Sequence, residues 1–189
     1  VDKQDLELSF TEMEILEALM TCAPDKAPGP DGFTMAFFQK SWNFIKADLL
    51  AAFNFFHQNC QMVRSCNASF IALIPKKKGA VELRDYRPIS LIGSVYKLLA
   101  KILAKRLGKV VDSLVSGQQS AFLKNRQITD ASMIANEVLD WKIKSGETGI
   151  LCKLDIEKAF DQLNWAYLVN ILKQMGFGER WIRWIYFCI

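Results

Sequence analysis

The segment that most limits the possible folds of this chain is residues 91–115, its longest periodic stretch. Apolar side chains recur there every three or four residues, which is the spacing of one helix face. They are Val95, Leu98, Leu99, Ile102, Leu103, Leu107, Val110, Val111 and Leu114. Such a helix must bury its apolar face against other elements. A chain of 189 residues, 51% of them hydrophobic, is long enough to supply that core as one domain or a large piece of one.

Other segments indicate a mixture of helices and strands. Thr11 and Glu14 have the spacing of a helix-capping box, and Asn164 and Gly176 can begin and end a helix near the C-terminus. Expected helices cover residues 9–22, 35–57, 91–115, 129–144 and 164–175, and expected strands cover residues 68–74 and 150–155. Residues 24–32 form a Pro- and Gly-rich loop, and residues 76–87 form a polar one. The order shows no regular βαβ alternation, so we expect an α+β fold.

Charge is distributed unevenly along the chain. Residues 1–60 carry 4 Lys or Arg and 9 Asp or Glu, residues 61–126 carry 13 and 3, and residues 127–189 carry 7 and 8. Lys97, Lys101, Lys105 and Lys109 form a stripe along the periodic helix that drifts around it, because 3.6 residues per turn is not four. A middle third this basic favours a polyanionic partner, although an ordinary solvated face remains an alternative.

The cysteines and the apolar runs indicate the cellular compartment in which the protein is expected. Five cysteines, odd in number and without a C-x-x-C pair, fit a reducing intracellular environment better than a disulfide framework. No apolar run reaches the roughly 18 residues of a membrane span, and no signal peptide is visible. The chain begins without methionine and finishes in an apolar segment that needs neighbours, so we expect it to be a fragment.

The segment from Leu151 to Asp161 is the main candidate for chemistry. Ile150, Cys152 and Leu154 alternate with more polar positions, which predicts a short strand that ends at Asp155 before a turn. A carboxylate at a strand end can hold Mg²⁺, which prefers one or two carboxylates and leaves room for phosphate oxygens. An aspartate that merely begins a turn is the alternative.

Five motifs then follow one another in order: Ala27-Pro28-Gly29-Pro30-Asp31-Gly32, Ile74-Pro75-Lys76, Asp85-Tyr86-Arg87-Pro88-Ile89-Ser90, Gln119-Ser120-Ala121-Phe122 with Arg126-Gln127-Ile128-Thr129-Asp130, and Leu154-Asp155-Ile156-Glu157-Lys158-Ala159-Phe160-Asp161. Each is weak alone. Together they resemble the reverse transcriptase of non-LTR (LINE-type) retrotransposons, particularly the kind abundant in plant genomes. The resemblance covers about residues 10–189 and departs at Asn125, where many relatives carry glycine.

The resemblance implies a right-hand polymerase fold. Residues 1–66 would be an N-terminal extension with the Pro/Gly loop, residues 67–149 the fingers and residues 150–189 the start of the palm. It also implies an RNA template, a DNA primer, deoxynucleoside triphosphates and two Mg²⁺ ions that promote phosphoryl transfer. Cytoplasm and nucleus are the compartments expected of the family, with no membrane association.

The resemblance also implies roles for particular residues. Asp155 matches the first metal-binding carboxylate, with the Ile156 carbonyl beside it, and Phe160 matches the aromatic gate that excludes a ribose 2′-hydroxyl. Lys76 and Arg87 match the residues that grip the triphosphate, although Lys77 or Lys78 could share that task. Candidate contacts with the RNA backbone are Lys97, Lys101, Lys105 and Arg126, and the loop at 27–32 either contacts template or is a structural turn.

The second set of polymerase carboxylates is missing. In this family it is an Asp-Asp pair, and no two aspartates are adjacent in this sequence. One carboxylate cannot hold both ions, so we expect the 189 residues alone to be inactive. Two hypotheses follow: a piece of a working reverse transcriptase, or a non-catalytic nucleic-acid-binding relic of a decayed element.

Overall fold

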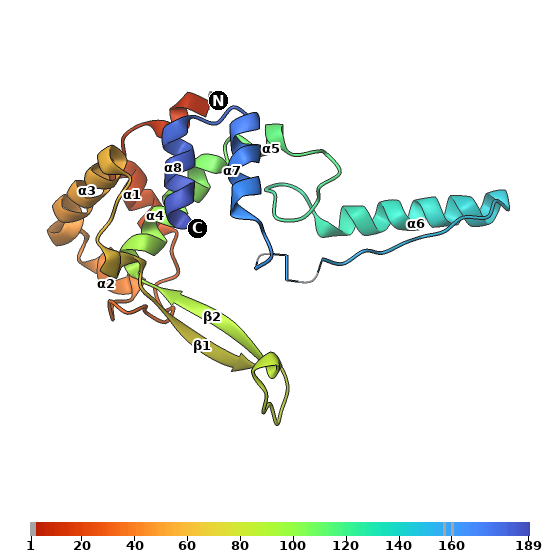
Figure 1. Ribbon diagram of the computed structural model, residues 1–189, viewed down its shortest axis with the longest axis horizontal. Helices are drawn as coiled ribbons and strands as arrows, with labels where there is room; N and C mark the ends of the chain where they lie inside the picture. The colour runs from red at the N-terminus through yellow and green to blue at the C-terminus, as the bar shows by residue number, and fades with distance from the viewer. Residues whose placement is uncertain (1–2, 157, 160) are drawn as a thin grey trace.

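Helix α4 (Ser94–Leu107) lies in the middle of a helical body built from both ends of the chain (Figure 1). The computed structural model describes residues 3–156, 158, 159 and 161–189. The remaining elements are η1 (Lys3–Glu7), α1 (Glu12–Met20), α2 (Met35–Lys40), α3 (Trp42–Asn59), η2 (Arg64–Asn67), β1 (Ser69–Pro75), η3 (Leu83–Asp85), β2 (Tyr86–Ile92), α5 (Val111–Leu114), α6 (Ile128–Ser145), α7 (Trp165–Gln174) and α8 (Glu179–Cys188).

One hydrophobic core joins the first 60 residues, α4 and the last two helices. Its largest fully buried side chains are Trp181, Trp184, Phe53, Phe56, Leu6, Ile15, Leu19, Leu98, Leu99 and Ile102. The apolar stripe expected on residues 91–115 is therefore the face that α4 buries. Glu7 adds a polar link between the two ends of the chain, because its Oε1 accepts a hydrogen bond from the N–H of Trp181 in the first turn of α8 (2.7 Å).

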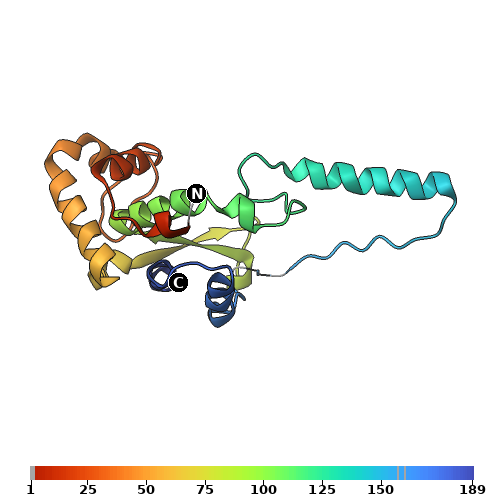
Figure 2. The ribbon, with the colours of Figure 1, turned by 90° about the horizontal axis from the view of Figure 1, so that it is seen from above.

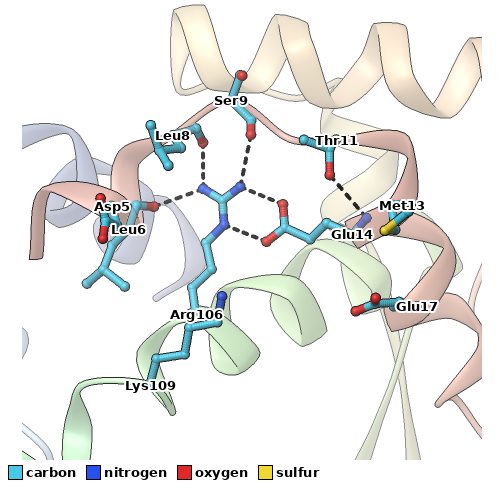
Figure 3. Close-up of a pocket in the computed structure, with 10 residues that line it drawn as sticks. All are labelled: Asp5, Leu6, Leu8, Ser9, Thr11, Met13, Glu14, Glu17, Arg106 and Lys109. Atoms are coloured by element: carbon cyan, nitrogen blue, oxygen red, sulfur yellow. Dashed lines mark hydrogen bonds and ion pairs between the residues drawn. The ribbon is translucent and has the colours of Figure 1, made fainter. Parts of the chain in front are cut away.

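The N-terminal segment is fixed to α4 by a buried arginine that sequence analysis did not single out. The Arg106 guanidinium donates through Nε and Nη2 to both Glu14 carboxylate oxygens (2.7 and 2.6 Å). It also donates to the backbone carbonyls of Leu6, Leu8 and Ser9 (Figure 3). The ring of Phe10 lies 4.5 Å from the guanidinium carbon. The Arg106 side chain is 5% exposed and that of Glu14 is 23% exposed, so the guanidinium is buried and its hydrogen bonds are met from within the protein.

Strands β1 and β2 form an antiparallel hairpin that projects from the helical body (Figure 1). The register runs from Ser69 opposite Ile92 to Pro75 opposite Tyr86. Apolar side chains from both faces of the hairpin are exposed, namely Phe70, Ile71, Leu73, Ile74 and Ile89. Sequence analysis expected β1 but interpreted the β2 region as loop and helix. Pro88 is tolerated opposite Leu73 because each strand of a two-stranded sheet has an edge that needs no donor.

Helix α6 projects from the body in a second direction, and the chain returns beside it (Figures 1 and 2). No residue of α6 is buried. The expected strand at residues 150–155 is wrong: residues 150–156 have no regular secondary structure. The physical reason is the lack of a partner strand, since among the described residues β1 and β2 pair only with each other. Ile150 is 98% exposed and Leu154 86%, so the alternating pattern finds no surface to pack on.

The expected helices exist, with changes at their ends. The helix expected at 35–57 is divided at Ser41, whose carbonyl begins α3 by accepting from the N–H groups of Phe44 and Ile45. The helix expected at 91–115 ends at Leu107, before Gly108, and α5 follows as a separate turn. Caps were predicted well: Thr11 Oγ1 accepts from the Glu14 N–H (3.2 Å), and Asn164 Oδ1 accepts from the Tyr167 N–H (3.0 Å). Gly176 follows α7 with a φ of 76°.

Replacing Arg106 by methionine should lower the free energy of unfolding by about 3–5 kcal/mol, because the Glu14 carboxylate and three carbonyls would lose their donors. Arg106→Lys should recover little of the lost stability, because an ammonium group cannot reproduce the planar set of guanidinium donors. Urea unfolding followed by circular dichroism measures the change. Thr11→Ala, which removes the N-cap of α1, the helix that carries Glu14, is the matched control and should cost about 1 kcal/mol. Equal losses for Arg106→Met and Thr11→Ala would contradict the structural role given to Arg106.

Candidate nucleotide and nucleic-acid site

The tip of the β1–β2 hairpin brings together the basic residues expected to hold a triphosphate. Lys76 directly follows β1, and its N–H donates to the Asp85 carbonyl (2.8 Å), so the hairpin closes there. Arg87 is the second residue of β2 and stands opposite Ile74. Lys76 and Arg87, 11 positions apart in the sequence, therefore lie at the same end of one rigid element.

The lysines of the tip differ in their partners. Lys76 Nζ donates to the Arg84 carbonyl (2.8 Å), and Lys77 Nζ pairs with Asp85 Oδ1 (2.8 Å). The hydrogen bond from Lys77 is the main cause of a lowered pKa of Asp85; desolvation opposes it, and the N–H groups of Val81 and Glu82 lower the pKa further. For Lys78 and Arg87, both exposed, no partner is found among the described residues. Asp85 thus holds the loop together while two cations of the tip stay available to an anion.

The lysine stripe lies on the side of α4 that faces away from the core. Lys101 is exposed and Lys97 and Lys105 are half-buried, while Arg106 is buried on the opposite side of the same helix. None of the three lysines forms an ion pair with a described carboxylate. Lys109 follows α4 and lines a surface pocket of about 730 Å³ beside Arg106 and Glu14 (Figure 3). The stripe is therefore an unpaired basic surface, as a polyanion-binding face requires.

Arg126 has a structural role in its own loop. Its Nη1 donates to the carbonyls of Ser116 and Gln119 (2.5 and 2.8 Å), which closes the segment between α5 and α6. Binding of RNA by Arg126 would have to use the remaining donors of the guanidinium. Helix α5 lies between the lysine stripe and the Arg126 loop along the chain (Figure 1).

The Pro/Gly loop at residues 27–32 packs against the start of α4. Asp31 Oδ2 accepts a hydrogen bond from the Ser94 N–H (2.5 Å), which satisfies one of the free donors at that helix end. A Cβ atom on Gly29 would lie 2.4 Å from the carbonyl carbon and oxygen of Ile92, so only glycine allows this close approach. The contacts support the structural reading of the loop, and contact with template remains a prediction.

The residues expected to bind metal lie in the extended segment before α7. Asp155 and Ile156 are exposed, and Ile156 is the last residue described before position 157. Among the described residues no group of three or more His, Cys, Asp or Glu side chains is placed to hold a metal ion. Phe160, the expected gate, lies outside the described residues. Asp161 is exposed in a turn in which the Gln162 N–H donates to the Lys158 carbonyl (3.0 Å).

The structure adds three polar residues that organise the site and that sequence analysis missed. Glu7, Asp31 and Arg106 each connect segments more than 60 residues apart. Arg106 carried a detectable signal, because it falls three and four positions after Leu103 and Ile102 on the buried stripe. The capping roles of Glu7 and Asp31 had no local signal, although Asp31 belongs to the Pro/Gly motif, because the helix ends that they cap are distant in the sequence.

Comparison with known proteins identifies the class of this fold. Residues 74–189 match the family described as reverse transcriptase (RNA-dependent DNA polymerase). The match begins at Ile74 in β1 and includes the hairpin tip, the lysine stripe, the Arg126 loop and Asp155. The chain belongs to the reverse transcriptase family.

Named relatives specify the type of reverse transcriptase. The chain is 30% identical over 183 residues to an uncharacterized 149 kDa protein of transposon TX1 from Xenopus laevis, a match that covers 97% of this chain and 14% of that protein. It is 28% identical over 167 residues to a Pol polyprotein from the type-1 retrotransposable element R2 of Nasonia vitripennis, covering 85% and 15%. A third relative, the Pol polyprotein of element R1 from Bradysia coprophila, is 24% identical over 186 residues, covering 97% and 18%.

These relatives are proteins of non-LTR elements, and the chain carries a reverse transcriptase domain of the LINE type. It spans only 14 to 18% of the length of the relatives named above. The TX1 match extends the likeness to the N-terminal helices, which lie before the residues matched by the family. Within the described part of the chain, no helix is long and apolar enough to cross a membrane, and all five cysteines are free thiols.

Proposed function

We propose that this chain forms the N-terminal extension, the fingers and the start of the palm of an RNA-directed DNA polymerase that copies retrotransposon RNA into DNA. The observation that carries the proposal is the family match over residues 74–189. The N-terminal extension would be residues 1–66, the fingers 67–149 and the palm segment 150–189. The shared core of α1–α4 and α8 supports a single structural unit across these boundaries.

In this proposal the hairpin tip binds the incoming deoxynucleoside triphosphate. Arg87 and Lys78 provide unpaired positive charge, and Lys76 can exchange its carbonyl partner Arg84 for a phosphate oxygen. The guanidinium group of an arginine can form two parallel hydrogen bonds to phosphate oxygens. This favours Arg87 as the residue that orients the triphosphate, with the lysines acting as point charges. Phe160 would exclude a ribose 2′-hydroxyl, a role that rests on the family resemblance alone.

Magnesium would be held partly by this chain. The Asp155 carboxylate and the Ile156 carbonyl are the hard oxygen donors that Mg²⁺ prefers, and both lie in an exposed segment that an ion can reach. Two donors are too few for a two-ion site, so further carboxylates must complete it. When bound, the ions would neutralise charge on the transferring phosphoryl group. The chain's own contribution is to hold one carboxylate in place and to orient the triphosphate.

The template would lie along the lysine stripe of α4 and the Arg126 loop. Four lysines at helical spacing give a row of charges on the surface opposite the core, and the N-terminal 60 residues, with 9 acidic and 4 basic residues, would repel the same strand. The charge pattern therefore orients RNA toward the middle third of the chain. A non-catalytic relic of a decayed element would retain this RNA binding. Only a measurement of DNA synthesis therefore distinguishes such a relic from a piece of a working reverse transcriptase.

The test of catalysis uses the 189 residues and a longer chain that continues through an Asp-Asp pair. The short chain should show no DNA synthesis with Mg²⁺ or Mn²⁺, and the longer one should be active. Asp155→Asn in the longer chain should slow single-turnover synthesis about a thousandfold, since it removes roughly 4 kcal/mol of ion-mediated stabilisation at about 1.4 kcal/mol per tenfold. RNA affinity should not change. Asp161→Asn is the matched control and should have a small effect; equal losses for the two variants would reject the role of Asp155.

The test of RNA binding uses salt. If about four lysines contact a single strand, the logarithm of the affinity should fall against the logarithm of salt concentration with a slope of about −3. Replacing Lys97 and Lys101 by alanine should reduce this slope by about 1.4. The control replaces Lys142 and Lys144 of α6, which already pair with Glu147 and Asp140, and should leave the slope unchanged. A slope that is the same in both double variants would contradict binding along α4.

A further inference from the structure

The loop between α5 and α6 presents an aromatic side chain fully to solvent in an unfavourable backbone conformation. Phe122 is 103% exposed, and its φ is 66°. Bulky residues rarely adopt positive φ, and a fully exposed phenylalanine gains nothing from burial. A strained residue persists only where its surroundings fix it, and such residues concentrate at sites that bind or react.

Hydrogen bonds on both sides of Phe122 hold this conformation. Arg126 Nη1 bonds the Ser116 and Gln119 carbonyls, and Gln119 Nε2 donates to the Ala121 carbonyl (3.2 Å). The Arg126 N–H donates to the Leu123 carbonyl (3.4 Å). The loop is thus built around the Arg126 side chain, and Phe122 lies at its outer end without a packing partner of its own.

The surroundings of Phe122 favour a polyanion as its ligand. Residues 101–126 contain six basic residues and a single acidic one, Asp112. Of the six, Arg106 is paired with Glu14, and Lys124, two positions after Phe122, is exposed. An exposed aromatic ring with flanking cations and amide side chains is the arrangement by which proteins bind single strands, because each base offers a π face to a ring.

We propose that Phe122 is a base-stacking residue for the single-stranded RNA template. This inference rests on the proposed function and adds a contact with a base to the contacts with phosphates along α4. Arg126 is a positioning residue in this scheme: it fixes the loop so that the Phe122 ring is presented in advance, which reduces the entropy lost on binding.

Another exposed phenylalanine provides a comparison within the chain. Phe44 on α3 is 83% exposed, but it lies in a regular helix and among the acidic N-terminal 60 residues. It has neither backbone strain nor neighbouring excess positive charge. Phe44 is therefore the matched control for the loss of an exposed aromatic ring.

The experiment measures the affinity of the 189-residue chain for a labelled single-stranded oligouridylate of about 12 nucleotides at fixed low salt. Phe122→Leu, which stays apolar but loses the ring, should weaken binding roughly 5- to 150-fold, the effect of one lost stacking contact. Phe122→Trp should bind as tightly as the unchanged chain or more tightly. Phe44→Leu should leave the affinity unchanged.

A stability measurement separates stacking from a structural role. Phe122→Gly can adopt the same positive φ without strain, so its Tm should stay the same or rise while its affinity falls as in Phe122→Leu. Affinity in Phe122→Leu equal to that of the unchanged chain would overturn the inference and leave the proposed function intact. A loss of affinity that tracks a fall in Tm would also overturn it. No RNA binding by the unchanged chain would remove the proposed template binding as well.

Discussion

The hydrogen-bonded pair of Arg106 and Glu14 is the interaction on which the arrangement of this domain depends. A buried guanidinium with all its donors used connects α4 to α1 and to the carbonyls of the segment before it. Phe10 and Trp184 both lie near the same guanidinium, at 4.5 and 6.0 Å from its carbon, so the first and last helices meet around it. Removing one partner would leave an uncompensated buried charge, which makes the pair a constraint on geometry.

Because α4 is fixed in this way, its two sides can carry out two tasks. One side supplies the core with Leu98, Leu99 and Ile102, and the other carries three lysines, of which Lys101 is exposed and Lys97 and Lys105 are half-buried. The β hairpin leads directly into α4 through Gly93, and Asp31 closes that junction from the Pro/Gly loop. The tip that would bind triphosphate and the helix that would bind template are therefore parts of one continuous segment of the chain.

Local patterns predicted the helices, their caps, β1 and the basic middle of the chain, because these depend on spacing within a few residues. The prediction failed where structure depends on distant partners. Ile150 to Asp155 alternates like a strand but finds no neighbour among the described residues, whereas β2 forms despite Pro88 because β1 lies beside it. The roles of Glu7, Asp31 and Arg106 are long-range for the same reason. The family assignment succeeded because the order of short motifs carries information that no single motif has.

Hydrogen–deuterium exchange with and without single-stranded RNA tests most directly whether α4 separates a structural side from a binding side. We predict slower exchange on RNA binding in residues 76–87 and 116–126 and in the backbone of α4, with no change in α3, which lies among the acidic first 60 residues of the sequence. Protection concentrated in α3, or none in residues 116–126, would contradict it.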